Sequence, residues 1–135
     1  MNAQNYTQKS LEAIQAAQKL TIDHANQQIE QIHLLCALLQ QENGLVPQLL
    51  KKMGITLESF EAAANAELNK LPRVTGSGRE ADKYYVARAV DTALNQAEEL
   101  AKQMKDEYVS VEHLFLSLIE NADQTLKDLF RPYQI

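Results

Sequence analysis

The sequence repeats itself at an offset of 80 residues, and this repeat limits the chain to a doubled architecture. Residues 6–55 align without a gap on residues 86–135, and eight of the fifty pairs are identical, against roughly three expected by chance. The identical pairs are Ala13/Ala93, Ala17/Ala97, Leu20/Leu100, His33/His113, Leu34/Leu114, Leu38/Leu118, Leu49/Leu129 and Ile55/Ile135. Because the shared positions recur at spacings of three, four and seven residues, the repeat preserves one buried face of each helix rather than a set of catalytic residues.

The composition favours helix throughout. Only four Gly and three Pro interrupt the 135 residues, and stretches with the apolar alternation of a strand are scarce. We therefore predict an all-α fold in which two pseudo-symmetric helical repeats pack as one globular domain. Repeat one covers about residues 6–71, a linker without apolar periodicity covers about 72–83, and repeat two covers about 84–135.

The apolar spacing and the capping residues predict seven helices. Their expected ranges are about 7–25, 30–41, 46–53, 57–71, 86–106, 111–121 and 125–130. Thr7, Thr56, Ser110 and Asp123 are the expected N-caps, and Gly54 is a suitable residue to end the third helix. Repeat two has no counterpart of the helix at 57–71, so we expect the chain to be a piece of something longer.

Charge and hydropathy argue against two classes of partner. The chain has 13 Lys and Arg against 18 Asp and Glu, a net charge of -5, which disfavours binding to nucleic-acid phosphates. The longest apolar run, Leu34 to Leu39, is far shorter than the roughly 20 residues of a membrane-spanning helix. The polar N-terminus and the single cysteine, Cys36, predict a soluble chain in the reducing cytoplasm.

Three residues are candidates for chemistry: His33, Cys36 and His113. An enzyme built on the repeat would use them as reactive groups, and a shared metal site or a proton switch would use the two histidines. We favour a structural interpretation, because Cys36 aligns on Leu116 and no third ligand recurs with the histidines. Each imidazole would then satisfy backbone groups at a helix start. We expect no catalytic residue, no metal and no cofactor in this chain.

Positions where the two halves disagree predict exposed apolar surface. If both halves bury the same face, an apolar residue opposite a charged one lies outside the core. Such pairs are Leu11 opposite Asp91, Ile22 opposite Lys102, and Ile32 opposite Glu112, and aromatic area nearby comes from Tyr84, Tyr85 and Tyr108. Single exposed apolar residues are common, so these pairs alone do not establish a functional patch.

Two segments carry a family resemblance. Residues 29–35 (IEQIHLL) and 109–115 (VSVEHLF) resemble the paired motif of the Clp N-terminal domain, which stands at the front of AAA+ unfoldases of the Clp class. The segments Tyr6–Leu11, Asn43–Leu50 and Leu68–Gly78 resemble the ClpB-type chaperone disaggregases more than the ClpC or ClpA type. The resemblance covers essentially the whole chain.

The resemblance implies a non-catalytic domain that engages substrate for a larger machine. It would bind unfolded or aggregated polypeptide weakly through a groove and pass it to a homo-hexameric ring, which binds ATP and magnesium and works with the DnaK chaperone system. The isolated domain would be monomeric. The alternative within the family is a domain of the ClpC or ClpA type that docks a folded adaptor protein and feeds a protease.

The resemblance also implies a set of substrate-binding residues, to which we add the exposed apolar candidates. The combined set is Thr7, Leu11, Ile32, Leu100, Asp106, Tyr108 and Glu112. The acidic role is expected only at Glu112, because Ile32 stands where an acid usually precedes the histidine in the first motif. Thr7 also has a plain role as an N-cap, and Leu100 as a core residue repeating Leu20. A groove with acidic residues at its rim would prefer segments that carry Lys or Arg beside apolar residues.

Overall fold

The computed structural model describes residues 2–74 and 84–135 of the chain. Its helices are α1 (Gln8–Asp23), α2 (Gln31–Gln40), α3 (Leu45–Lys52), α4 (Leu57–Asn69), α5 (Arg88–Gln103), α6 (Val111–Glu120) and α7 (Gln124–Phe130). Short 3-10 helices occupy Ala3–Asn5 and Arg131–Tyr133, and two-residue strands β1 (Gln28–Ile29) and β2 (Tyr85–Val86) complete the described elements. The predicted all-α fold class is confirmed, while most of the predicted linker, residues 75–83, lies outside the described residues.

Helices α5 and α6 begin and end 80 residues after α1 and α2. Both α1 and α5 stop two to three residues earlier than the apolar pattern predicts. The reason is a left-handed residue after each helix, Ala25 with φ 54° and Lys105 with φ 59°. The next amide then bonds back to the carbonyl of Thr21 (3.0 Å) in one half and of Ala101 (2.8 Å) in the other, which closes the helix end.

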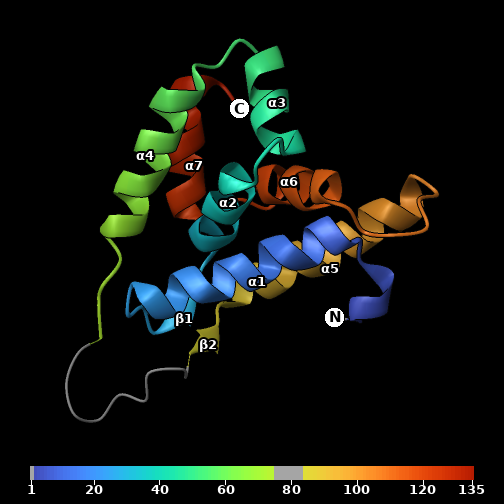
Figure 1. Ribbon diagram of the computed structural model, residues 1–135, viewed down its shortest axis with the longest axis horizontal. Coiled ribbons are helices and arrows are strands. Elements are labelled where there is room, and N and C mark those ends of the chain that lie inside the picture. Colours follow the sequence, from blue (N-terminus) through green and yellow to red (C-terminus); the bar gives the residue numbers. More distant parts are fainter. Residues whose placement is uncertain (1, 75–83) are drawn as a thin grey trace.

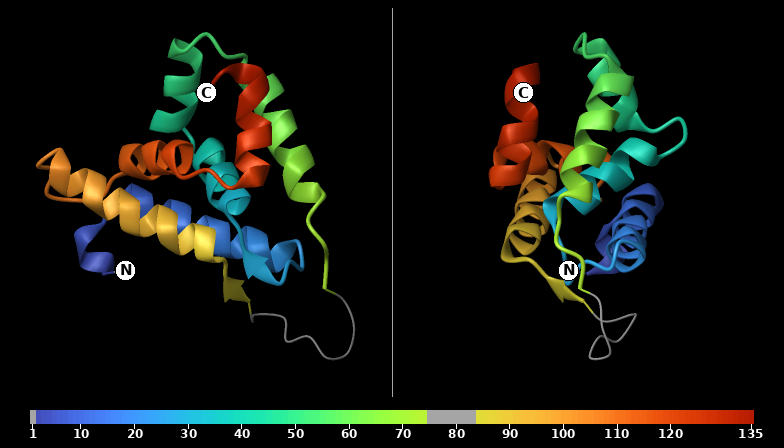
Figure 2. Two further views of the ribbon diagram at one scale, coloured as in Figure 1. Left: turned by 180° about the vertical axis from the view of Figure 1, so that it is seen from behind. Right: turned by 90° about the vertical axis from the view of Figure 1, so that its left-hand side faces the viewer.

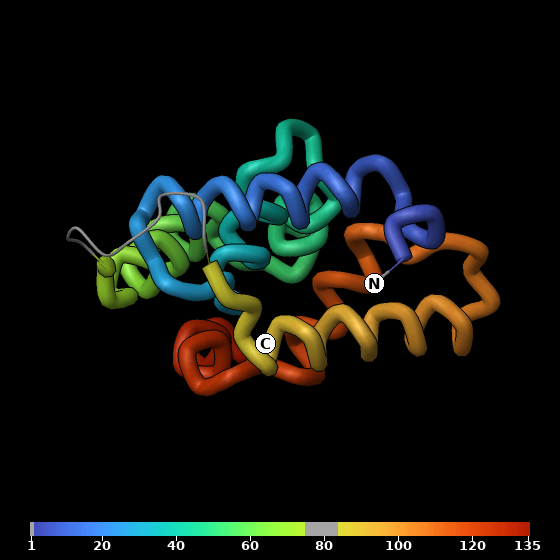
Figure 3. The backbone as a smooth tube through the Cα atoms, turned by 90° about the horizontal axis from the view of Figure 1, so that it is seen from below, coloured from blue at the N-terminus to red at the C-terminus, as the bar shows by residue number. Residues whose placement is uncertain are grey.

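The helices lie in three tiers (Figure 1). Helices α1 and α5 form one tier and run alongside each other in opposite directions, as the view from below shows (Figure 3). Helices α2 and α6 form the middle tier, and α3, α4 and α7 form the third, which both views of Figure 2 show on the far side of the middle tier from α1 and α5.

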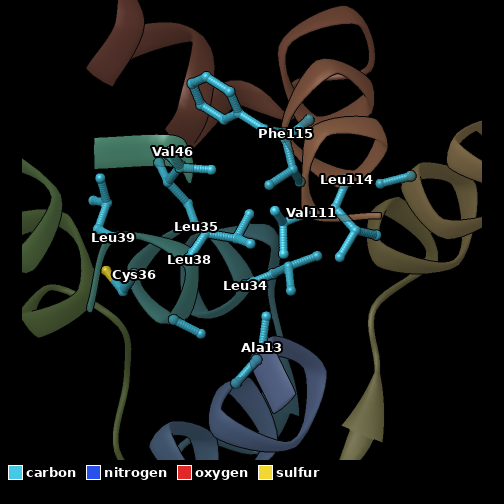
Figure 4. Close-up of a cluster of buried hydrophobic side chains, with 14 of the residues drawn as sticks. Ala13, Leu34, Leu35, Cys36, Leu38, Leu39, Val46, Val111, Leu114 and Phe115 are labelled. Atoms are coloured by element: carbon cyan, nitrogen blue, oxygen red, sulfur yellow. The ribbon is translucent and has the colours of Figure 1, made fainter. Parts of the chain in front are cut away.

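Helix α2 is the centre of the core. Every residue from Gln31 to Leu39 is buried, and α2 makes contact with helices of all three tiers. Figure 4 shows its leucines between Ala13 of α1, Val46 of α3 and the side chains of α6. A helix that is apolar on every side is stable only where other helices surround it, and this position meets that condition.

Two parallel strand contacts join the halves. Ile29 of β1 pairs with Val86 of β2, and an isolated bridge pairs Tyr6 with Val109. The amide of Thr7 donates to the carbonyl of Val109 at 2.9 Å. Because α1 and α5 are antiparallel, the two contacts lie at opposite ends of the α1–α5 pair.

The predicted N-caps are the N-cap residues of the structure. The side chains of Thr7 and Asp123 accept bonds from the amides of Ser10 (3.2 Å) and Leu126 (3.0 Å). Thr56 precedes α4 without a side-chain capping bond. Gly54 follows α3 with φ 81°, a conformation that favours glycine.

Candidate functional site

Most of the predicted site residues come together at one end of the α1–α5 pair, where α1 begins and α5 ends. We name this region the polar end and define it as Thr7, Leu100, Asp106, Tyr108 and Glu112. The chain brings it together because Thr7 is bonded to Val109, the residue that follows Tyr108. Leu11, one turn into α1, is half-buried beside it and packs against the core.

Asp106 is tied to a buried histidine. His113 accepts a bond at Nδ1 from the Ser110 amide at 2.9 Å, so its proton lies on Nε2, which donates to the Asp106 carboxylate at 2.8 Å. His113 is buried, while the Asp106 side chain is 46% exposed. Asp106 therefore orients the imidazole and still presents a carboxylate oxygen to solvent.

The remaining polar-end residues differ in exposure. Glu112 is exposed and Tyr108 is 47% exposed, so both are accessible to a partner. Leu100 is half-buried. The Thr7 hydroxyl is engaged in capping α1, because it accepts from the Ser10 amide and lies 3.0 Å from the Ser10 hydroxyl.

Ile32 does not belong to this surface, and the prediction that it is exposed is wrong. The side chain is only 1% exposed, because α2 is enclosed by helices on every side. The offset argument assumed that both halves expose the same positions. Glu112 is exposed on α6, but its counterpart on α2 lies in the core. Ile22, the third residue of that argument, is half-buried.

A second feature lies at the opposite end of the α1–α5 pair. It is a cleft of about 200 Å³ between α1 and α5, and we name it the apolar cleft. Its lining residues are Ile14, Gln18, Ile29, Leu34, Tyr84, Val86, Val90, Asp91 and Leu94. Val86 is 48% exposed, and its neighbour Tyr85 is 68% exposed. The cleft therefore offers apolar walls that open to solvent beside an exposed aromatic ring.

Sequence reasoning missed the apolar cleft as a site. Ile14 and Leu94 have the spacing of core residues, and the pattern assigned them to the inner face of their helices. The usable signals were Tyr84 and Tyr85, two large aromatic residues just ahead of α5. What the pattern could not show is that α1 and α5 leave room between them, with Leu34 of α2 among the lining residues.

The candidates for chemistry occupy structural positions. Burial raises the pKa of the Cys36 thiol to about 12, which disfavours the reactive thiolate. His33 does not pair with Cys36, because Nδ1 accepts from the Glu30 amide at 2.8 Å and Nε2 donates to Asn26 at 2.8 Å. Both histidines thus bind the backbone amide that precedes their helix, which confirms their predicted structural role.

The described residues contain no group of three or more His, Cys, Asp or Glu side chains placed to hold a metal ion. Within the same residues, no helix combines the length and the apolar character needed to cross a membrane.

Comparisons with known sequences agree on one family. The model of the Clp repeat (R) N-terminal domain matches residues 5–133. The chaperone protein ClpB of Nitratidesulfovibrio vulgaris is 40% identical over 93% of this chain, and that of Clostridium tetani is 35% identical over its whole length. The chain spans only 15% and 16% of those two relatives.

A comparison with solved structures agrees with the sequence matches. The crystal structure of the Hsp104 N-terminal domain from Candida albicans superposes with a TM-score of 0.84 at 26% identity. The match covers 97% of this chain and 83% of that one.

Proposed function

This chain belongs to the Clp N-terminal domain family, and we propose that it captures exposed apolar segments of unfolded or aggregated polypeptide. The observation that supports the proposal is the apolar cleft, which leaves Val86 of a folded chain half exposed beside Tyr85. Apolar clefts with a few polar groups are the usual form of a binding site. Within this chain we assign no catalytic role to any residue.

The size of the cleft supports weak and unselective binding. Burying two or three apolar side chains of a client would contribute about 1.5 to 3 kcal/mol each. The loss of translational and side-chain freedom on binding costs about 4 to 15 kcal/mol. We therefore expect single-domain dissociation constants that are micromolar or weaker.

We further propose that the chain is the substrate-engaging part of a ClpB-type disaggregase. Both sequence relatives described above carry the name ClpB, and this chain corresponds to a small part of each. The rest of such a protein would form the hexameric ring, bind ATP and magnesium, and cooperate with the DnaK system. Six tethered copies would raise the avidity of a weak binder without any new contact.

The polar end adds charge to this proposal. Asp106 and Glu112 each present an exposed carboxylate, and the chain is acidic overall with a net charge of -5. Client segments that carry Lys or Arg beside apolar residues would be attracted to it. Thr7, Leu11, Leu100 and Tyr108 would complete the binding surface along the α1–α5 face.

The proposal is tested by an NMR titration of the domain with an unfolded model protein. We expect weak, saturable shifts of amides around Val86 and Leu94, and smaller shifts around Tyr108 and Glu112. A titration without shifts would contradict capture of unfolded chains. Tight, stoichiometric binding to a folded adaptor in the same assay would instead support the ClpC- or ClpA-type role.

A charge variant tests the polar end separately. Glu112→Gln should weaken capture of a Lys-containing peptide about twofold to fivefold, consistent with the small energies of exposed charge pairs, and leave thermal stability unchanged. Glu120→Gln is the matched control, because Glu120 is an exposed acid at the other end of the same helix. Equal effects of the two variants would remove Glu112 from the binding surface.

A further inference from the structure

The two ends of the α1–α5 pair follow the same plan. At one end Ile29 pairs with Val86, and at the other Val109 pairs with Tyr6. Adding 80 to the number of Ile29 gives Val109, and adding 80 to Tyr6 gives Val86. The same helices and the same pairing therefore surround both ends, and only the side chains differ.

The end that contains Tyr6 is closed by an aromatic side chain. Tyr6 is 5% exposed and belongs to the buried apolar cluster. Its hydroxyl donates to the Glu98 carboxylate at 3.1 Å. Beside it, the Ser10 hydroxyl donates to the Val109 carbonyl at 2.9 Å. A flat apolar ring with a polar tip thus fills the space between the start of α1 and the end of α5.

The opposite end lacks this ring. The residue equivalent to Tyr6 is Val86, which is 48% exposed and lines the apolar cleft. Gln18 of the lining is the counterpart of Glu98, the partner of the Tyr6 hydroxyl. Ile14 and Leu94 both line the cleft and are each other's counterparts. The cleft is therefore the space that a tyrosine ring fills at the closed end.

We propose that the apolar cleft takes an aromatic side chain, Phe or Tyr, from an extended segment of an unfolded client, with a Tyr hydroxyl meeting the side-chain amide of Gln18. This inference rests on the proposed function and names the side chain that the site selects. The volume agrees, because an apolar cavity of about 150 Å³ holds a benzene ring and the cleft measures about 200 Å³. The closed end supplies the pattern of contacts, with an apolar wall and one polar group for the tip of the ring.

A peptide series tests the preference. Four peptides that differ only at their central residue, Tyr, Phe, Leu or Ala, are titrated into the domain and followed by NMR. We expect the Tyr and Phe peptides to bind about tenfold or more tightly than the Ala peptide, and more tightly than the Leu peptide. Equal affinity of the Leu and Tyr peptides would overturn the aromatic preference.

A variant that closes the cleft tests its location. Val86→Tyr places the ring of the closed end at the open end, and Gln18→Glu in addition restores the acceptor for its hydroxyl. We expect the Tyr peptide to fall to the affinity of the Ala peptide, with an unchanged or higher melting temperature. Tyr85→Ser is the control, because Tyr85 is exposed next to Val86 but is not among the residues that line the cleft. Unaltered Tyr-peptide binding by Val86→Tyr would overturn the assignment.

A second variant keeps the test informative if Val86→Tyr does not fold. Gln18→Ala leaves the helix and the apolar walls in place and removes the polar group. We expect the advantage of the Tyr peptide over the Phe peptide to disappear, and a retained advantage would overturn the role of Gln18.

Titration of the wild-type chain and of Val86→Tyr with an unfolded model protein separates the two proposals. Binding that is equal in both proteins would overturn the aromatic site and leave the proposed function standing. No binding by the wild-type chain would overturn the proposed function itself.

Discussion

The two halves of the molecule share a backbone plan but bury different amounts of it. Residues 31–39 of α2 are buried without a break, whereas α6 exposes Glu112. At the α1–α5 ends, Tyr6 is buried and Val86 is half exposed. The repeat thus supplies a frame twice, and the differences between the copies decide which surfaces are closed and which remain open for binding.

The histidines show the same contrast at the level of single side chains. Both accept the amide that precedes their helix and donate to a residue seven positions earlier. His33 meets Asn26, which is buried, while His113 meets Asp106, which is partly exposed. The first half therefore uses the motif only to hold its core, and the second half uses it to hold a surface carboxylate.

The largest expected effect comes from removing each imidazole in turn. We expect His33→Ala to cost about 4 kcal/mol of unfolding free energy, since it leaves a cavity and removes the partner of the buried Asn26 Oδ1. His113→Ala should cost about 2 kcal/mol, because Asp106 turns to water instead. Urea unfolding measures both, with circular dichroism as the check that the helices remain. Equal losses would mean that the two halves depend on their histidines alike.

The second prediction concerns acid. Burial lowers the pKa of His33 to about 4, the nearby His24 adds to the decrease, and the bond with the Glu30 amide opposes it. Below pH 6.5 the unfolded chain binds a proton at this position that the native protein does not. Stability should therefore fall, by up to about 3 kcal/mol, as the pH drops from 6.5 to about 4.

The measurement is the change in unfolding free energy between pH 7 and pH 4.5. His33→Gln keeps a donor for Asn26 but cannot take up a proton, so we expect it to lose about 2 kcal/mol less than the wild-type chain over this interval. His24→Gln is the control and should change the acid sensitivity much less. An unchanged pH dependence in His33→Gln would assign the loss to other groups.

Much of this contrast was predictable, and the rest depends on packing. The offset of 80 residues predicts the equivalence of α1 with α5 and of α2 with α6, and the caps at Thr7 and Asp123 predict the helix starts. It does not predict burial, which is why Ile32 was wrongly expected at the surface. A periodic pattern describes one helix, whereas exposure depends on how many neighbours surround it. The division into two repeats and a linker at residues 72–83 stays a prediction.

The smallest predicted effect concerns the first residues of α1 and α5. Thr7 caps α1 through its hydroxyl, but its counterpart Ala87 precedes α5 without a side-chain capping bond. Thr7→Ala should cost about 1 kcal/mol, and Ala87→Ser should gain up to about 1 kcal/mol. Thermal unfolding of the two variants measures both changes.

The same pair separates the capping role of Thr7 from its proposed role in binding. Thr7→Ser keeps the hydroxyl, so we expect it to retain the cap. If Thr7 contacts clients, Thr7→Ala weakens capture of an unfolded protein at a temperature where the domain is fully folded, and Thr7→Ser does not. Unchanged capture by folded Thr7→Ala would leave Thr7 as an N-cap alone and would move the binding surface away from the start of α1, towards the apolar cleft.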